Sequence, residues 1–365
     1  MKQMFTLAEL AQRIEGDKRA SADFIAPTAA LSMQPDARLM VGSSNVIQPL
    51  TESGHNQLGT LLRIPAEYYD RLRTSDPVIL ASNVNHWLSR RPVGERRMVR
   101  TLNNTVRAIL SDSYRRIDNH DVAQVVLSIL GDIPGLRIAS CAVTDSRMYI
   151  KAVSTKIERE VKGTKRVGDM VQAGVVITNS EIGLGSLGVF GFAEFLACTN
   201  GMCRSKDGLR ITHLGRKADA TLEGLLSDGT KKLEDRAVLS KVGDVITNAF
   251  SPEAFDKFIA SLSSAAQQPI TAGSIPDMIE QLAPSSSGLG FGLNQGERDG
   301  VLKHLIEGGD LSRYGLINAV TRTAQDAESY DRATELEAAG FKLLDMPSKD
   351  WSRLMAQPVQ LKLAA

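Results

Sequence analysis

The stretch that decides the fold reads Arg97-Met-Val-Arg-Thr-Leu-Asn-Asn-Thr-Val-Arg-Ala-Ile-Leu110. Two short β-prone runs flank Asn103-Asn104, two residues that tolerate positive φ, and this pattern predicts a tight β-hairpin. With the asparagines at the centre of the turn, Arg100 lies directly opposite Arg107. Two arginines that face each other across a ladder repel unless an anion lies between them. The hairpin therefore predicts an anion site, for a ligand such as phosphate.

The hairpin belongs to a basic block in a chain whose net charge is only +1. The arginines of this block are Arg90, Arg91, Arg96, Arg97, Arg100, Arg107, Arg115 and Arg116, opposed by Glu95 and Asp112. Because the guanidinium fork suits phosphate oxygens, the block predicts a polyanion-binding surface, and nucleic acid is the commonest polyanion. The alternative is that the arginines are solvated or pair with carboxylates such as Asp118 or Asp121.

A second basic patch follows farther along the chain, opposed by Asp207. Its members are Arg204, Lys206, Arg210, His213, Arg216 and Lys217. By itself such a run is typical of a solvated face. If it meets the arginine hairpin in space, the two patches form one positive track; the sequence leaves both arrangements open.

Length and composition indicate a globular protein with a large core. The chain has 365 residues, of which 42% are hydrophobic and 23% charged, so two or three structural units are expected. It has no run of about 18 or more apolar residues, which predicts no transmembrane helix and no membrane partner. The N-terminus has the pattern of a helix start, not of a signal peptide. Three cysteines, an odd number, favour a reducing cytoplasm over a disulfide framework.

Periodicity predicts an α+β fold: a central mixed domain with a largely antiparallel sheet and packed helices, followed by a helical C-terminal part. We place an N-terminal segment at 1–60, the α+β core domain at 61–245 and the helical region at 246–365. The predicted helices are Leu7–Ile14, Pro65–Leu72, Asp121–Leu130 capped by Asn119, Leu233–Leu262, Glu297–Glu307 and Tyr314–Ala339. The further predicted strands are Leu136–Val143, Met148–Val153, Val175–Thr178 and Ser186–Phe190. Pro77–Arg90 fits either a helix or a strand.

The candidate catalytic groups form weak constellations. Cys198, Cys203 and His213 lack the paired spacing of a zinc site, and no group that would orient a Cys–His nucleophile is apparent. Asn179 and Glu181 share one face of a strand end, but one carboxylate does not make a two-metal nuclease site. We expect those two residues to hold a Gly-rich turn by hydrogen bonds. No metal, no cofactor and no catalytic residue is predicted, which favours a binding protein over an enzyme.

A polar stripe marks the last long helix. Asn318, Thr321, Arg322 and Gln325 recur at helical spacing, beside apolar positions on the same helix. Such a stripe is typical of a helix with one wet face. The alternative is a contact with another subunit or with nucleic acid.

Several motifs together resemble one family. They are Val99-Arg-Thr-Leu102, Arg107-Ala-Ile-Leu-Ser-Asp-Ser-Tyr-Arg-Arg-Ile-Asp-Asn119, Gly174-Val-Val-Ile-Thr-Asn-Ser-Glu181, Cys198-Thr-Asn-Gly-Met202 and His213-Leu-Gly215. They resemble the uncharacterised phage, prophage and plasmid family called domain of unknown function 932, over most of the chain. The motif residues for which we expect a structural or functional role are Asn179, Glu181, Thr199, Asn200, Gly201 and His213. The resemblance implies a mobile-element setting and a role around DNA.

One function is expected, and two alternatives stay open. We expect a sequence-independent nucleic-acid-binding protein of phage or plasmid DNA metabolism that favours single-stranded DNA, acts in strand annealing or recombination, and forms homo-oligomers. An arginine-rich hairpin is similar to what single-strand annealing proteins use to line a groove. One alternative is a protein-binding module that counters host defence. The other is an enzyme acting on nucleic acid or nucleotides, built around Asn179, Glu181, Cys198 and His213.

Overall fold

The computed structural model describes residues 5–42, 46–197, 200–212, 228–284 and 290–356. Its centre is a five-stranded antiparallel sheet with the strand order β11-β10-β9-β8-β7. The strands are β7 (Leu136–Val143), β8 (Met148–Glu160), β9 (Met170–Asn179), β10 (Leu187–Phe195) and β11 (Asn200–Ile211). Each strand pairs with the strand next to it in the chain, so the sheet is a meander.

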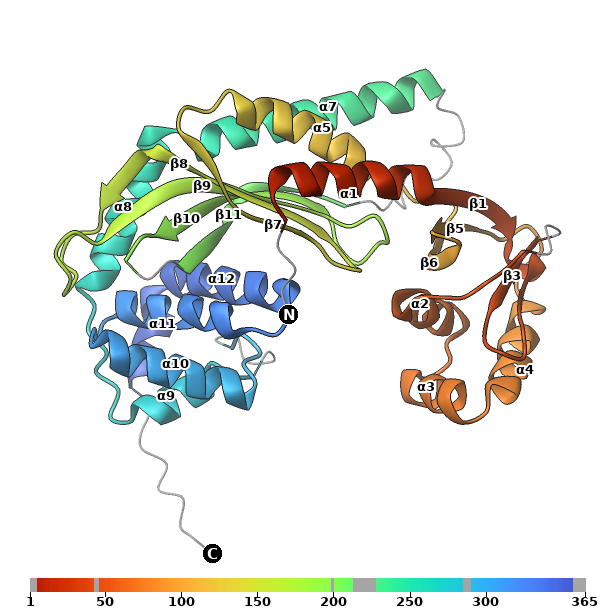
Figure 1. Cartoon of the computed structure of the whole chain (residues 1–365). Helices are drawn as coiled ribbons and strands as arrows, with labels where there is room; N and C mark the ends of the chain where they lie inside the picture. Colours follow the sequence, from red (N-terminus) through yellow and green to blue (C-terminus); the bar gives the residue numbers. More distant parts are fainter. Residues whose placement is uncertain (1–4, 43–45, 198–199, 213–227, 285–289, 357–365) are drawn as a thin grey trace, which may run out of the picture.

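Helices cover both faces of this sheet (Figure 1). On one face lie α1 (Leu7–Ala20), α5 (Asn119–Gly131) and α7 (Asp228–Ala249). The C-terminal helices gather beside the sheet and on its other face. They are α8 (Pro252–Ala266), α9 (Ile275–Gln281), α10 (Gln295–Gly308), α11 (Arg313–Asp326), α12 (Tyr330–Asp345) and α13 (Ser348–Met355). The sheet and these helices form the main lobe.

A smaller N-terminal lobe lies at one end of the main lobe (Figure 1). It contains a three-stranded sheet of the order β1-β5-β6 and a second small sheet of the order β2-β3-β4. The strands are β1 (Ser21–Pro27), β2 (Leu31–Met33), β3 (Leu39–Val41), β4 (Ile47–Gln48), β5 (Arg96–Leu102) and β6 (Thr105–Ser111). The helices are η1 (Thr28–Ala30), α2 (Glu52–Leu62), α3 (Ala66–Ser75) and α4 (Pro77–Leu88).

Each lobe has its own hydrophobic core. The N-terminal lobe buries side chains from Ala26 to Ile109. The main core begins with Leu10 and Ile14 of α1 and continues from Ile117 to the C-terminal helices. The boundaries predicted near residues 60 and 245 do not separate these two clusters, because α1 packs on the main sheet and the C-terminal helices share its core.

The α+β fold with an antiparallel sheet and a helical C-terminal part is confirmed. The long helices predicted across Leu233–Leu262 and Tyr314–Ala339 are each two helices. Ser251 caps α8 ahead of Pro252, and Ser329 caps α12, since a hydroxyl that accepts the first free amides starts a new helix. Pro77–Arg90 is helical through Leu88. Among the described residues, no helix is long and apolar enough to cross a membrane.

The Asn103-Asn104 turn forms as predicted, but the predicted register is wrong. Both asparagines have positive φ, 49° and 58°. Thr101 pairs with Val106, yet Arg100 pairs with Ala108. Arg107 is therefore the extra residue of a β-bulge, and the bulge removes it from the position opposite Arg100.

The two faces of the main sheet differ in polarity. The face toward α1, α5 and α7 is apolar, whereas the face toward α12 carries a buried ion pair between Lys151 Nζ and Glu337 Oε2 at 2.6 Å. Burial favours the neutral amine, but the Glu337 carboxylate raises the pKa of Lys151 overall. The Lys151 ammonium also lies 4.7 Å from the ring centre of Tyr330. α12 is thus fixed on the sheet by charge as well as by packing.

This ion pair leads to a first prediction. Lys151→Met alone leaves the Glu337 carboxylate buried without its counter-ion, so we expect the free energy of unfolding to fall by about 3 kcal/mol or more. The double variant Lys151→Met/Glu337→Leu removes both charges and should recover most of that loss. Urea denaturation of the three proteins measures both quantities. A double variant that is as unstable as the single one would contradict a charge-based explanation.

A second prediction concerns His55, which lies buried in α2 with Nδ1 3.0 Å from Tyr69 Oη. Burial, helped by the charge of Arg73, lowers the pKa of His55 from 6.5 to about 4. The unfolded chain therefore binds a proton first, and stability falls as the pH drops from about 6.5 to about 4. Two and a half pKa units correspond to about 3 kcal/mol at most.

His55→Gln should lack this component. The difference in unfolding free energy between wild type and His55→Gln, measured from about pH 7 to pH 4, isolates the histidine because shared carboxylate titrations cancel. We expect wild type to lose stability relative to the variant on acidification. A difference that does not change with pH would show that His55 is not held neutral.

Candidate functional site

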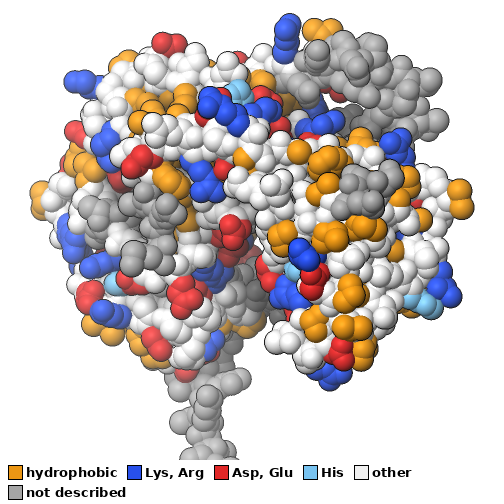
Figure 2. All heavy atoms as spheres, turned by 45° about the vertical axis from the view of Figure 1, so that its right-hand side comes forward, with side chains coloured by type: hydrophobic (Ala, Val, Ile, Leu, Met, Phe, Trp, Pro, Cys, Tyr) orange, Lys and Arg blue, Asp and Glu red, His pale blue; other side chains and the backbone are white. Residues whose placement is uncertain are grey.

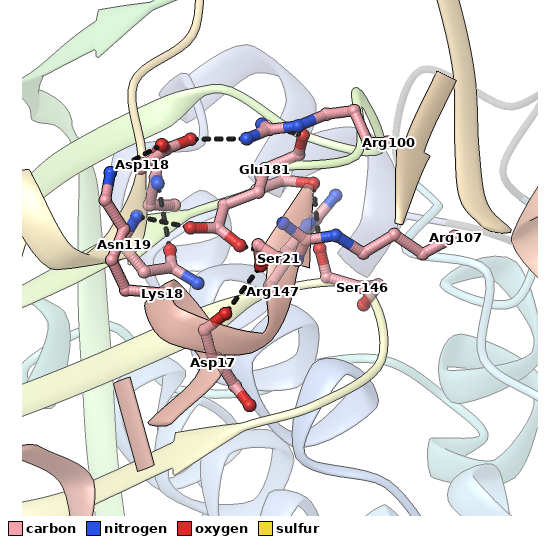
Figure 3. A network of polar contacts seen from close by, with 12 residues as sticks. Asp17, Lys18, Ser21, Arg100, Arg107, Asp118, Asn119, Ser146, Arg147 and Glu181 are labelled. Atoms are coloured by element: carbon pink, nitrogen blue, oxygen red, sulfur yellow. Dashed lines mark hydrogen bonds and ion pairs between the residues drawn. The ribbon is translucent and has the colours of Figure 1, made fainter. Parts of the chain in front are cut away.

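The arginine hairpin and the Asn-Ser-Glu motif meet at the junction between the lobes (Figure 3). Arg100 lies at the centre, with only 1% of its surface exposed. Its Nε donates to Asp23 at 2.9 Å and its Nη2 to Asp118 at 2.6 Å. Its Nη1 donates to the backbone carbonyl of Glu181 at 2.8 Å. One buried guanidinium thus joins β1 to the chain segments before α5 and after β9.

Arg107, displaced by the bulge, reaches the same cluster from the other side. Its Nη1 donates to Glu181 Oε2 at 2.6 Å, while Glu181 Oε1 accepts the backbone N–H of Asn119 at 2.7 Å. A carboxylate at the first turn of α5 is also favoured by the helix dipole. Asn179 donates to the carbonyl of Ile117 and to Asn119 Oδ1, both at 2.9 Å. Asn119 is the first residue of α5, not its cap; Asp118 holds the cap position.

Arg100 and Arg107 each form ion pairs with carboxylates of the chain itself. Burial would raise the pKa of Asp118, but the charges of Arg100 and Lys18 hold it below its usual value. Lys18 Nζ lies 3.2 Å from Asp118 Oδ2. The position predicted for a bound anion is therefore occupied by the protein's own carboxylates. Of the two explanations that the sequence left open for Arg100 and Arg107, carboxylate pairing is the one observed.

The other arginines of the block divide into paired and exposed ones. Arg91 and Arg97 both bind the carboxylate of Glu95, each at 2.9 Å. Arg90 donates to the His86 carbonyl at 3.2 Å, and Arg116 lies 3.4 Å from Asp23 while half exposed. Arg96 is exposed and Arg115 is partly buried. The block is therefore not one open cationic surface.

The second basic patch lies elsewhere. Arg204 is buried, with its guanidinium carbon 4.7 Å from the ring centre of Phe258, at the end of the sheet away from the N-terminal lobe. It lines a groove of about 760 Å³ between β11, α8 and α12. Arg210 is exposed and lies over Phe190 at 5.7 Å. The residues Thr199, His213, Arg216 and Lys217, and the side chain of Lys206, lie outside what the structure describes.

The described residues of the Thr-Asn-Gly motif, Asn200 and Gly201, pack β11 against α11 and β10. Asn200 Nδ2 donates to Thr321 Oγ1 at 2.5 Å and lies 3.4 Å from Asn318 Oδ1, so it anchors β11 on α11. A Cβ at Gly201 would come 2.2 Å from the ring of Phe192. Only glycine lets that ring lie flat across the neighbouring strand. Part of the polar stripe predicted for the last helices is thus a contact within the chain.

Two of the three cysteines, Cys203 and Cys141, can be assessed in the part of the chain that the structure describes. Burial raises the pKa of the Cys203 thiol to about 12, so it carries almost no thiolate, the reactive form. Cys141 donates to the carbonyl of Phe5. Cys198 lies outside the described residues. Within the described ranges, no group of three or more His, Cys, Asp or Glu side chains could hold a metal ion.

A different basic surface, which the sequence analysis missed, lies at the β8–β9 hairpin tip. The tip is the segment 161–168, Val-Lys-Gly-Thr-Lys-Arg-Val-Gly, which has three cations and no carboxylate. Lys162, Lys165 and Arg166 are exposed, and Val167 is 100% exposed. In Figure 1 the tip projects at the end of the sheet opposite the N-terminal lobe. Cations spaced along a turn between two β-prone runs were the signal that could have identified it.

Hydrogen bonds hold this tip in place. The Lys162 amide donates to Ser263 Oγ of α8 at 3.0 Å, and Thr164 Oγ1 donates to the Arg166 carbonyl at 2.8 Å. Lys165 Nζ donates to the carbonyl of Gly309, which follows α10. The tip is therefore supported by two helices of the main lobe.

A shallow hollow of about 50 Å³ lies beneath the tip, between it and the helices α10 and α11. Its cationic lining comes from Lys165, Arg166 and Arg322, and its carboxylates from Asp169 and Asp310. Burial raises the pKa of Asp169, and its Oδ2 accepts a hydrogen bond from Tyr314 Oη at 2.7 Å. Arg322, one of the residues of the predicted polar stripe, thus lies beside the tip cations.

The junction yields a third prediction. Arg100→Ala should lower the free energy of unfolding by about 3–5 kcal/mol, because it leaves two carboxylates without their buried partner. Arg116→Ala is the matched control, since Arg116 contacts the same Asp23 from the surface and should change stability by less than about 1 kcal/mol. Chemical denaturation distinguishes the two. Equal, small effects would mean that the network does not hold the lobes together.

Comparison with known proteins adds no relative. No family model matches the chain, and no curated protein and no solved structure shows significant similarity to it. The resemblance to domain of unknown function 932 therefore stays a prediction.

Proposed function

We propose that this protein binds nucleic acid without base specificity, with single-stranded DNA as the favoured ligand, and that the β8–β9 hairpin tip is the main contact. The observation that carries the proposal is the cluster of Lys162, Lys165 and Arg166, three exposed cations within five residues of one hairpin tip. Phosphate contacts by lysine and arginine supply the sequence-independent part of nucleic-acid affinity.

The shape of the tip supports this assignment. A hairpin that projects from a sheet and is fixed by hydrogen bonds presents its cations without a large ordering cost. Val167, next to Arg166, is fully exposed, and an apolar side chain beside cations can contact the face or edge of an unpaired base. The few exposed aromatic rings argue for backbone contacts as the main source of affinity.

The neighbouring surface offers further cationic contacts. Arg322 of α11 lines the hollow that Lys165 and Arg166 also line, so a backbone that follows the tip meets a third cation there. The Arg322 side chain is 35% exposed, with Nη1 3.7 Å from Glu307 Oε2. Asp169 lies buried in the same hollow, where it accepts a hydrogen bond from Tyr314 and interacts with the charge of Arg166. The Arg100 network has no part in this contact, because its arginines already bind carboxylates.

The biological setting belongs to the same proposal. The motif resemblance supports a phage or plasmid setting for this proposal, and a sequence-tolerant DNA contact would suit strand annealing or recombination there. A net charge of only +1 means that the whole molecule has little long-range attraction for a polyanion. Binding then depends on the local cluster, and it should be sensitive to salt.

A fourth prediction tests the tip. The variant Lys162→Ala/Lys165→Ala/Arg166→Ala should weaken binding to a labelled single-stranded oligonucleotide about tenfold or more at low salt. It should also reduce the slope of log affinity against log salt by about two, since each lost contact with a single strand removes about 0.7. Fluorescence anisotropy with a homopolymeric and a mixed-sequence oligonucleotide measures affinity, slope and base preference.

The matched control removes the same number of charges elsewhere. Arg19, Arg71 and Lys349 are exposed on three other helices, and their triple alanine variant should keep nearly the wild-type affinity and slope. Equal losses of affinity in both variants would show that the net charge of the protein, and not the tip, determines binding. If wild type binds neither single-stranded nor duplex nucleic acid at low salt, the proposed function is wrong.

A further inference from the structure

One surface helix of the N-terminal lobe carries no charge. The sequence of α4, Pro77–Leu88, contains no Asp, Glu, Lys or Arg. Its buried side packs Leu80, Val84 and Leu88 into the lobe core. Its outer side exposes 58% of Val78, 46% of Ile79 and 46% of Trp87. Figure 2, which turns this lobe toward the viewer, shows several groups of hydrophobic side chains on its surface.

Such a composition is typical of an interface. Surface helices normally carry charged residues on the outer face, whereas the centre of a protein interface loses charges and gains tryptophan and other large apolar groups. The helix is also rigid. Asn85 Oδ1 accepts the Met33 amide at 2.7 Å and Asn85 Nδ2 donates to the Met33 carbonyl at 2.8 Å, so α4 is fixed to the edge of β2.

The residue spacing on this face is symmetric about Asn83. Ile79 lies four positions before Asn83 and Trp87 four positions after it. Asp76, the N-cap residue, lies seven positions before it, and Arg90 lies seven after it, just beyond the C-cap Ser89. Residues four positions apart share one face of a helix, so Ile79, Asn83 and Trp87 form one stripe, while Asp76 and Arg90 flank the two ends of the helix. An antiparallel pair of α4 helices with its two-fold axis beside Asn83 therefore brings Ile79 of each helix to Trp87 of the other.

The charges at the two ends of the helix complement each other in the same pairing. Asp76 of each copy lies opposite Arg90 of the other copy, giving two ion pairs around an apolar centre. Asp76 accepts the Ile79 amide through Oδ1, and Arg90 donates to the His86 carbonyl through Nη1, so each can use its second terminal atom across the interface. Asn83 Nδ2 donates to the Ile79 carbonyl within the helix at 3.0 Å; its second amide hydrogen and its Oδ1 can bind the Asn83 of the other copy at the axis.

We propose that α4 is a homodimerisation surface, occupied by α4 of a second copy of this chain in an antiparallel, two-fold arrangement. A C2 interface must be self-complementary, and this face meets that condition in both its apolar and its charged residues. The contact is independent of the β8–β9 tip, which lies at the other end of the molecule. One helix pair is a small interface, so we expect a dissociation constant on the order of micromolar.

Sedimentation over a range of concentrations tests the proposal on the full chain. Wild type should shift from monomer to dimer as concentration rises, and Ile79→Asp should raise the dissociation constant about tenfold or more, since it places a carboxylate in the apolar centre. The matched control is Ile306→Asp on α10, an equally apolar side chain that is 66% exposed. The control should dimerise like wild type.

A crosslink tests the symmetry axis itself. With a short bis-maleimide, Asn83→Cys should give a covalent dimer, because the two thiols face each other across the axis. Lys303→Cys, a 67% exposed position on α10, and wild type provide the background. A protein that stays monomeric at high concentration overturns the proposal. A dimer that Ile79→Asp does not weaken and that Asn83→Cys does not crosslink overturns it as well, by assigning the contact to another surface.

Discussion

The buried guanidinium of Arg100 is the constraint on which the arrangement of the two lobes depends. It takes one carboxylate from β1, a second from the segment before α5 and a carbonyl from the segment after β9. Loss of either carboxylate would leave this buried guanidinium without one of its counter-ions, which costs several kcal/mol. The same guanidinium cannot also neutralise a phosphate. The hairpin that looked most like a binding surface is therefore the element that joins the lobes, and binding is proposed for the opposite end of the sheet.

Much of the fold could be predicted because local patterns determine it. The positive-φ asparagines fixed the turn of the hairpin, and helical periodicity located most of the helices. The bulge at Arg107 could not be predicted, because one extra residue leaves the alternation of the strand almost unchanged. The partners of Arg100 could not be predicted either, because Asp23 lies 77 positions away along the chain. Ion pairing between residues so far apart in sequence depends on the tertiary fold, and the number of arginines in a segment gives no information about that fold.

The two proposed binding surfaces, the β8–β9 tip and α4, differ in the sequence signal that marks them. The tip 161–168 is a short segment with three cations and two glycines, and by count it is a weaker signal than the eight arginines at 90–116. Its advantage is that all three of its cations are exposed in the folded chain. α4 is the opposite case, since its signal is the lack of any charge on a helix that turns out to be on the surface. In both cases exposure decides the interpretation, and exposure is known only once the neighbouring elements are in place.

The route of the chain through the junction has a consequence for how the molecule is assembled. The polypeptide leaves the main lobe after α1 and returns to it before α5, and Lys18 of the departing segment contacts Asp118 of the returning one. The N-terminal lobe is therefore an insertion whose two ends lie side by side. Because the main core closes through α1, the sheet and the C-terminal helices, a short connection between α1 and α5 would keep the connectivity of the main lobe without this insertion.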